Sequence, residues 1–122
     1  MTLEVPRVRS AVRFTDSIQL APDNALAQNN LGLVLDRMND VPGAIARFER
    51  AVELEPGSSH YFNNLGYSYY RKGDLNPAIA SLRESLRLNS NFPRAQANLA
   101  QVMERRSGKV EVELAPEPRL KK

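Results

Sequence analysis

The sequence contains no cysteine, so disulfide bonds and thiolate metal sites are excluded. Its single histidine, His60, has no other candidate ligand or proton-transfer partner around it that would indicate a metal site or a general base. The sequence also lacks a Gly-rich phosphate loop, a Gly-x-Ser-x-Gly motif and paired metal ligands. We therefore expect no enzymatic activity, no cofactor and no bound metal.

Long apolar runs are missing as well. No segment approaches the roughly 18 apolar residues of a membrane span, and no apolar core of a secretory signal follows the amino terminus. We expect no membrane association and a cytoplasmic location. The formal net charge is +3, and its acidic and basic residues are interspersed along the chain. Such a charge is a weak argument for nucleic acid, and no nucleic-acid partner is expected.

What the sequence does contain is an internal repeat. The stretch 62–69 recurs at 28–35 and at 96–103, with asparagine, leucine and a small residue in the same three columns. Further columns in the second half of the unit hold small, apolar or turn-forming residues: Ser10, Ala44 and Ala78; Phe14, Phe48 and Leu82; Ser17, Ala51 and Ser85; Pro22, Pro56 and Ser90. A fixed period of about 34 residues indicates a repeat architecture rather than a domain with a single core.

The order of these columns, Leu-Gly, a large apolar residue, Ala, Phe, Ala and a closing Pro, resembles the tetratricopeptide repeat, a helix-turn-helix unit of about 34 residues. The resemblance covers residues 7–106, although the tryptophan column of the family here holds Gln28, Phe62 and Gln96. It implies an all-α fold: a short α-solenoid of stacked antiparallel helix pairs, with two full repeats flanked by a half repeat at each end.

The chain is predicted to divide into a series of segments along this repeat. They are an extended lead-in (1–7), a half repeat with only the second helix (8–22), two full repeats (25–58 and 59–92), a terminal capping helix (93–108) and a tail (109–122). In the tail, Val110, Val112 and Leu114 alternate with glutamates, a pattern typical of a short strand. The alternatives are a solvated tail and the first strand of a further domain.

The helix predicted from Ala25 to about Met38 has two faces. The face expected in the core carries Ala27, Leu31, Val34, Leu35 and Met38. The face expected to stay accessible carries Leu26, Asn29, Asn30, Leu33 and Arg37. Ser58 is predicted to cap the next first helix, and Gly73 to end it in the left-handed conformation.

Stacked helix pairs turn slightly from one to the next, so the first helices of successive units are expected to line a concave groove. Its columns would be Leu26, His60, Arg94; Asn29, Asn63, Ala97; Asn30, Asn64, Asn98; Leu33, Tyr67, Gln101; Asp36, Tyr70, Glu104; and Arg37, Arg71, Arg105. The candidate peptide-binding residues are Asn29, Asn30, Asn63, Asn64, Tyr67, Tyr70, Arg71, Arg94, Asn98 and Arg105. Asparagine amides can bond to a peptide backbone, tyrosines offer rigid apolar area, and arginines suit carboxylates.

Two functional hypotheses remain open. The first is a non-enzymatic interaction module that binds an extended, acidic segment of a partner protein in the groove. The second is a structural assembly or oligomerisation piece of a larger protein, which pairs through its exposed terminal helices. The half repeat at 8–22 favours the second, including association between copies through this first helix. The sequence of residues 64–70 is also similar to that of bacterial repeat proteins, among them pilus-assembly and secretion-associated ones.

Some members of the family hold the terminal carboxylate of a partner with Lys, Asn, Asn, Lys and Arg. The matching positions here are Asn29, Leu33, Asn64, Arg94 and Asn98. Only Asn64 is identical, and Arg94 preserves a charge. The resemblance therefore does not imply a chaperone adaptor.

Overall fold

The computed structural model describes residues 22–114, and within this range all regular structure is helical. The helices are α2 (Ala25–Arg37), α3 (Val41–Leu54), α4 (Ser59–Lys72), α5 (Leu75–Leu88) and α6 (Pro93–Leu114). The predictions for the lead-in, for nearly all of the first half repeat and for the end of the tail fall on residues outside this range.

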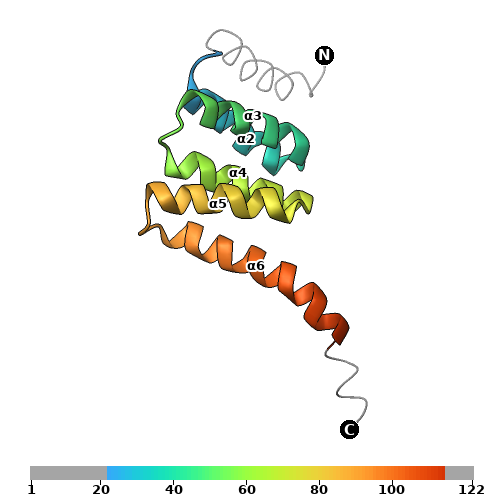
Figure 1. Ribbon diagram of the computed structural model, residues 1–122. Helices are drawn as coiled ribbons and strands as arrows, with labels where there is room; N and C mark the ends of the chain where they lie inside the picture. The colour runs from blue at the N-terminus through green and yellow to red at the C-terminus, as the bar shows by residue number, and fades with distance from the viewer. Residues whose placement is uncertain (1–21, 115–122) are drawn as a thin grey trace, which may run out of the picture.

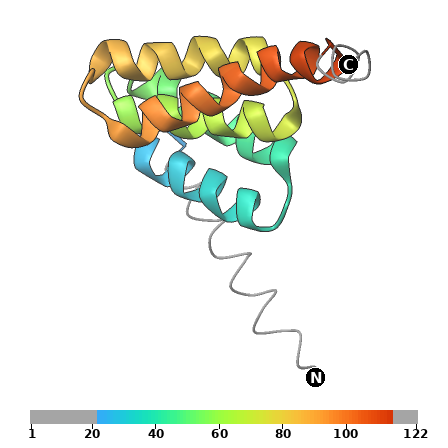
Figure 2. The ribbon, with the colours of Figure 1, turned by 90° about the horizontal axis from the view of Figure 1, so that it is seen from below.

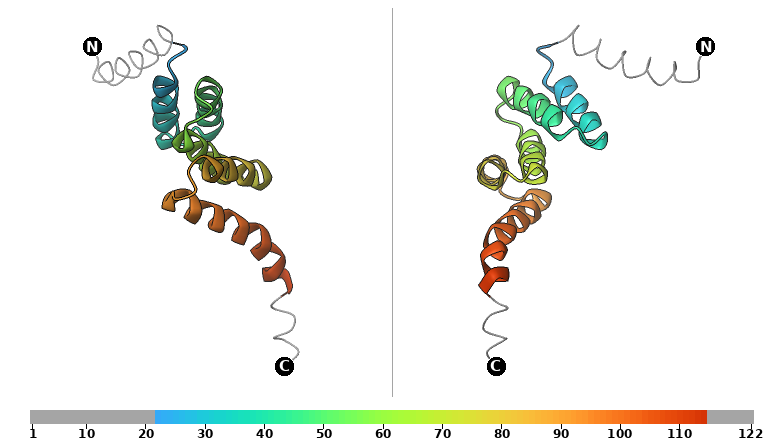
Figure 3. Two further views of the ribbon diagram at one scale, coloured as in Figure 1. Left: turned by 60° about the vertical axis from the view of Figure 1, so that its left-hand side comes forward. Right: turned by 90° about the vertical axis from the view of Figure 1, so that its right-hand side faces the viewer.

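The helices stack in layers. The antiparallel pair α2 and α3 forms the first layer, α4 and α5 form the second, and α6 lies against the second (Figure 1). Each layer is turned relative to the one before it (Figure 3). Contact is most extensive within a pair, while α3 packs on α4 and α5 packs on α6 between layers. This architecture confirms the prediction of an all-α solenoid of stacked helix pairs.

Local sequence signals set the helix ends. The backbone N–H of Ala27 donates to Oδ1 of Asn24 at 3.0 Å, which caps α2. In the same way the N–H of Tyr61 donates to Oγ of Ser58 at 3.2 Å and caps α4, as predicted. At the other end of α4, Gly73 has a φ of 98°, a left-handed conformation that glycine adopts without steric cost.

The core consists of two clusters that repeat the same columns. The first joins Ala44, Ile45 and Phe48 of α3 to Leu65 of α4. The second joins Ala78, Ile79 and Leu82 of α5 to Val102 of α6. Each cluster therefore joins the second helix of one layer to the first helix of the next. Each layer thus helps to bury the one before it.

The predicted core face of α2 is partly wrong. Val34 and Met38 are 40% and 65% exposed, although the prediction placed both in the core. Val102, in the same column as Val34, is 0% exposed because α6 packs against a preceding layer. No described layer precedes α2, which is the first described helix of the stack (Figure 1). Conversely Asn29, predicted to be accessible, is buried.

The end of the last helix also differs from the prediction. The sequence placed its end at Ser107 and Gly108, followed by a tail with a short strand. In the structure α6 is 22 residues long and continues to Leu114. Figure 2 shows that it extends beyond the ends of α4 and α5. A glycine inside a helix costs only about 1 kcal/mol, and the Lys, Glu and Leu residues that follow Gly108 favour helix. The short apolar alternation did not outweigh these preferences.

One contact between layers couples the fold to pH. The Tyr69 hydroxyl on α4 donates a short hydrogen bond to a carboxylate oxygen of Glu49 on α3. Burial, and then this bond, raise the pKa of Tyr69 from its ordinary value of about 10 to about 12. The folded state therefore favours the neutral phenol, and this stabilisation is complete below pH 10 and is lost as the pH rises toward 12.

Replacing Tyr69 by phenylalanine should consequently destabilise the protein below pH 10 and matter less above it. We expect the difference in free energy of unfolding between wild type and Tyr69→Phe to be constant below pH 10 and to shrink as the pH rises to about 12. Urea unfolding of both proteins across this range measures it. Contributions from the rest of the chain are common to both proteins and cancel in the comparison. A difference that stays constant with pH would show that Tyr69 does not carry the shift.

Candidate functional site

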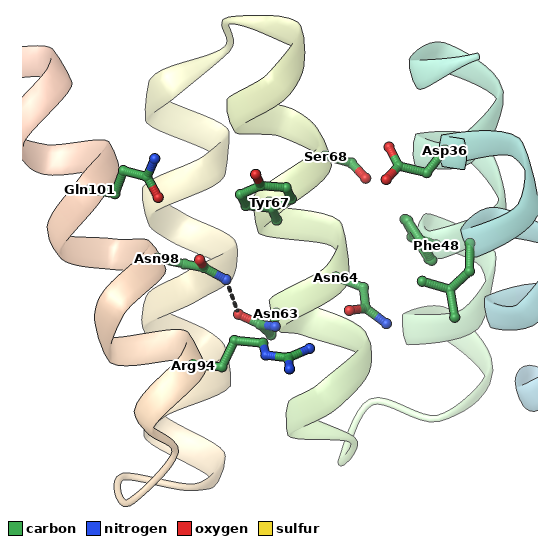
Figure 4. A pocket seen from close by; sticks show the side chains of 10 residues that line it. Asp36, Phe48, Asn63, Asn64, Tyr67, Ser68, Arg94, Asn98 and Gln101 are labelled. Atoms are coloured by element: carbon green, nitrogen blue, oxygen red, sulfur yellow. Dashed lines mark hydrogen bonds between the residues drawn. The ribbon is translucent and has the colours of Figure 1, made fainter. Parts of the chain in front are cut away.

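A hollow of about 360 Å³ opens between the first helices α2, α4 and α6 (Figure 4). We call it the central hollow. Its lining residues are Leu33, Asp36, Phe48, Asn63, Asn64, Tyr67, Ser68, Arg94, Asn98 and Gln101. In Figure 4 the α6 side chains approach from one side and Asp36 of α2 from the other, with Tyr67 and Asn64 of α4 between them. The hollow therefore lies along the row of first helices where the groove was predicted.

Pairs of asparagines join these helices. Nδ2 of Asn64 donates to Oδ1 of Asn29, and Nδ2 of Asn98 donates to Oδ1 of Asn63, both at 2.9 Å. In each pair the donor follows the acceptor by 35 residues and lies on the next layer. The acceptors Asn29 and Asn63 are buried, at 6% and 3% exposure. Asn64 and Asn98 each keep a second amide N–H and their own oxygen for other bonds, because an amide has two donor hydrogens.

Two of the predicted arginines also join layers. Arg71 on α4 forms a short ion pair with Asp36 on α2, and its Nη2 donates to Oδ1 of Asn39 at 3.1 Å. One layer further on, the guanidinium of Arg105 lies 5.2 Å from the ring centre of Tyr70. Asp36 and Tyr70 share a column, as do Arg71 and Arg105. The same two columns thus meet at both junctions between layers, through a salt bridge at the first and a cation–π interaction at the second.

The remaining cation and the apolar surface of the hollow lie where a partner could reach them. Arg94 is exposed, lines the central hollow, and forms no ion pair with the described side chains. Leu33 on α2 and Tyr67 on α4 share a column and are 38% and 37% exposed. Exposed side chains of this size are few in the described part of the chain, and these two flank one hollow.

The structure brings together only part of the predicted set. Those that line the central hollow are Asn63, Asn64, Tyr67, Arg94 and Asn98. Those that do not are Asn29, Asn30, Tyr70, Arg71 and Arg105.

Several lining residues were not among the predicted ones. Leu33, Asp36 and Gln101 stand in the predicted groove columns, so the repeat register could have found them. Ser68 and Phe48 could not be found in this way. Ser68 is buried, and Phe48 reaches the hollow from α3, a second helix.

Within residues 22–114, no cluster of three or more His, Asp or Glu side chains could hold a metal ion. Nor is any described helix both long and apolar enough to cross a membrane.

Comparisons with known proteins agree with the fold. Family models of the tetratricopeptide repeat match residues 7–59 and 66–106. Among solved structures, a mutant O-GlcNAc transferase of Thermobaculum terrenum is similar, with a TM-score of 0.71 and 32% identity over 75% of this chain and 18% of that chain. The first TPR of Spaghetti (RPAP3), bound to an HSP90 peptide, is similar with a TM-score of 0.74 and 18% identity, over 77% of this chain and 75% of that one. No curated protein sequence gives a match.

Proposed function

The chain belongs to the tetratricopeptide repeat family, and we propose that it is a protein-interaction module whose central hollow holds an extended segment of a partner protein. Domains of this family are in general non-catalytic interaction modules, and the absence of enzymatic activity remains a prediction for this chain. The observation that carries the proposal is the meeting of amide groups, exposed apolar side chains and one arginine in a single hollow between three helices.

The partner's backbone would be held by the asparagines of the hollow. An extended peptide presents N–H and C=O groups alternately along each edge, and a primary amide can satisfy both kinds. Asn64 and Asn98 keep a donor and an acceptor after bonding to Asn29 and Asn63. They lie on neighbouring layers, so together they can hold two points of one extended segment.

The partner's side chains would be selected by Leu33, Tyr67 and Arg94. The first two favour one large apolar side chain, because they are partly exposed on both sides of the hollow. Arg94 favours one carboxylate, which its forked guanidinium can bind through two hydrogen bonds. Arg71 and Arg105 are engaged between layers. The preferred segment is therefore one with a single acidic group beside an apolar residue, less acidic than the sequence had indicated.

The comparison structures support such a use of the fold. The first TPR of Spaghetti was solved with the HSP90 peptide SRMEEVD, which combines acidic residues with apolar ones. At 18% identity it shares the fold with this chain. A solenoid of this shape can thus accommodate a short peptide, while the choice of peptide depends on the residues of the hollow.

Selection from a random peptide library displayed on phage tests the proposal. We expect enriched peptides to pair one acidic residue with one large apolar residue and to bind at around micromolar strength, about 8 kcal/mol, because ordering a peptide offsets much of its contact energy. Replacing both Asn64 and Tyr67 by alanine should abolish binding. Arg94→Ala should weaken the enriched peptides and remove the preference for the acidic residue.

The matched control is Arg83→Ala on α5, an exposed arginine that does not line the hollow. It should leave binding unchanged, and helical circular dichroism should be the same for all variants. Enriched peptides that bind the Asn64 and Tyr67 double variant as well as the wild type would place the binding surface elsewhere.

A further inference from the structure

The two side walls of the central hollow differ in character. On α6 the lining residues are all polar: Arg94, Asn98 and Gln101. On the opposite side, formed by α2 and α3, they are Leu33, Phe48 and Asp36. The carboxylate of Asp36 is already engaged in the ion pair with Arg71. A carboxylate of a bound segment is therefore favoured on the α6 side, at Arg94, and an apolar side chain on the α2 side, at Leu33.

A segment that stays inside this hollow lies along α4. The helices α2, α4 and α6 run in the same direction through the stack (Figure 1). In Figure 4 the α4 side chains lie between those of the other two helices. Asn64 belongs to α4, and Asn98 is held against α4 by its bond to Asn63. Both amides can therefore bond to the same edge of one backbone, the edge that faces α4.

The side chains of such a segment alternate between the two walls. In an extended chain successive side chains point to opposite sides, roughly at right angles to the backbone N–H and C=O groups. With one backbone edge on α4, these two sides face α6 and α2. A side chain at Arg94 and a side chain at Leu33 therefore stand an odd number of positions apart in the partner.

The distance along the helices decides which odd number applies. Arg94 stands seven positions before Gln101 on α6, and Gln101 shares its column with Tyr67. Leu33 stands in that column as well. Seven helical residues rise by about 10 Å and an extended chain advances by about 3.3 Å per residue, so the two contacts lie about three partner residues apart. Figure 4 shows the same order: Arg94 lies at one end, Tyr67 and Gln101 lie toward the other, and the asparagines lie between.

We propose that the hollow selects segments in which one carboxylate and one large apolar side chain stand three positions apart, an inference that rests on the proposed binding of an extended segment. The carboxylate binds Arg94, and the apolar side chain packs between Leu33 and Tyr67. The backbone of the two intervening residues faces Asn64 and Asn98. A primary amide both donates and accepts, so the hollow takes this motif in either order along the partner. The two groups thus share the hollow without being neighbours in the partner's sequence.

Fluorescence anisotropy with labelled synthetic peptides tests this spacing. Each peptide holds one glutamate and one phenylalanine in a serine-rich background, one to four positions apart and in both orders, with both ends blocked to remove other charges. We expect a spacing of three to bind about tenfold or more tighter than two or four, because those peptides cannot reach Arg94 and Leu33 at once. A spacing of one should also bind more weakly, since it covers only about 3.3 Å of the offset.

Moving the cation along α6 makes the test sharper. Arg94 and Gln101 are both exposed and line the same wall, so changing them leaves the core untouched. In the double variant Arg94→Ala, Gln101→Arg the cation stands in the column of Leu33 and Tyr67. The preferred spacing should then fall from three to one, the shortest that keeps the two side chains on opposite walls. Arg94→Ala alone should abolish the preference, and the control Arg83→Ala should retain it.

The outcomes separate the spacing from the proposed function. Binding that the Asn64 and Tyr67 double variant loses, but that is equal at all spacings, overturns the spacing and leaves the hollow as the binding surface. A preference for two or four positions also overturns the spacing. So does a preference that stays at three when the cation is moved to position 101. Peptides that fail to bind at every spacing overturn both proposals.

Discussion

Phe48→Ala is expected to lower the free energy of unfolding by about 3 to 5 kcal/mol, the range for removing a buried phenylalanine side chain. Phe48 is 1% exposed and belongs to the first core cluster. Its ring also packs where a side chain on Gly32 would otherwise lie, so it fills the closest approach of α2 and α3. Neither helix can close the gap without breaking its contact with α4, and a cavity would remain.

The control for this substitution is Phe62→Ala on α4, where the phenylalanine is only half-buried. Its cost should be clearly smaller. Urea unfolding followed by circular dichroism measures both, with a second probe in α6 because stacked repeats need not unfold in one step. Equal costs for the two variants would mean that the Phe48 column does not dominate the packing of a pair.

Gly66→Ala is expected to destabilise the protein by about 1 to 3 kcal/mol, the usual cost of overpacking a close contact. A Cβ at this position would lie 2.7 Å from Cγ of Leu82 and 3.1 Å from the backbone oxygen of Ala78. Leu82 is fully buried and the oxygen belongs to α5, so neither atom can move aside without shifting the helix. Replacement by leucine should cost more than replacement by alanine.

The same change at Gly108 provides a control of opposite sign. Gly108 lies inside α6, and a Cβ there would meet no atom within 4 Å. Gly108→Ala should therefore stabilise the protein by up to about 1 kcal/mol, through the lower entropy of the unfolded chain and the better helix propensity of alanine. Gly66→Ala with stability equal to or above the wild type would show that α4 and α5 approach less closely than the structure indicates.

The layered fold was predictable because its determinants are local and periodic. Caps such as Ser58, the left-handed Gly73 and the small columns at Gly32 and Ala44 act within one unit, so a shift of the sequence against itself reveals them. The exposure of Val34 was not predictable in this way. Periodicity finds the apolar side of a helix, but whether that side is covered depends on which layer comes before it.

The central hollow was predicted less completely for a related reason. The register places Asn63 and Asn64 in adjacent columns and does not distinguish their roles. The turn between layers brings residues 35 apart together, so Asn64 bonds to Asn29 rather than to a residue in its own column. The same offset of 35 residues brings Arg71 into an ion pair with Asp36. Columns therefore identify the wall of the groove, while the pairing across layers decides which side chains a partner can use.

The asparagine pairs also make the hollow preorganised. Freezing a side chain when a ligand binds costs about 0.5 to 1.5 kcal/mol. The amides of Asn64 and Asn98 are already fixed by Asn29 and Asn63, so that entropy is lost on folding and not on binding. The same bonds tie the orientation of the binding amides to the angle between layers. In the proposed binding mode, a change in the angle between layers would therefore turn these amides away from a bound backbone and weaken binding.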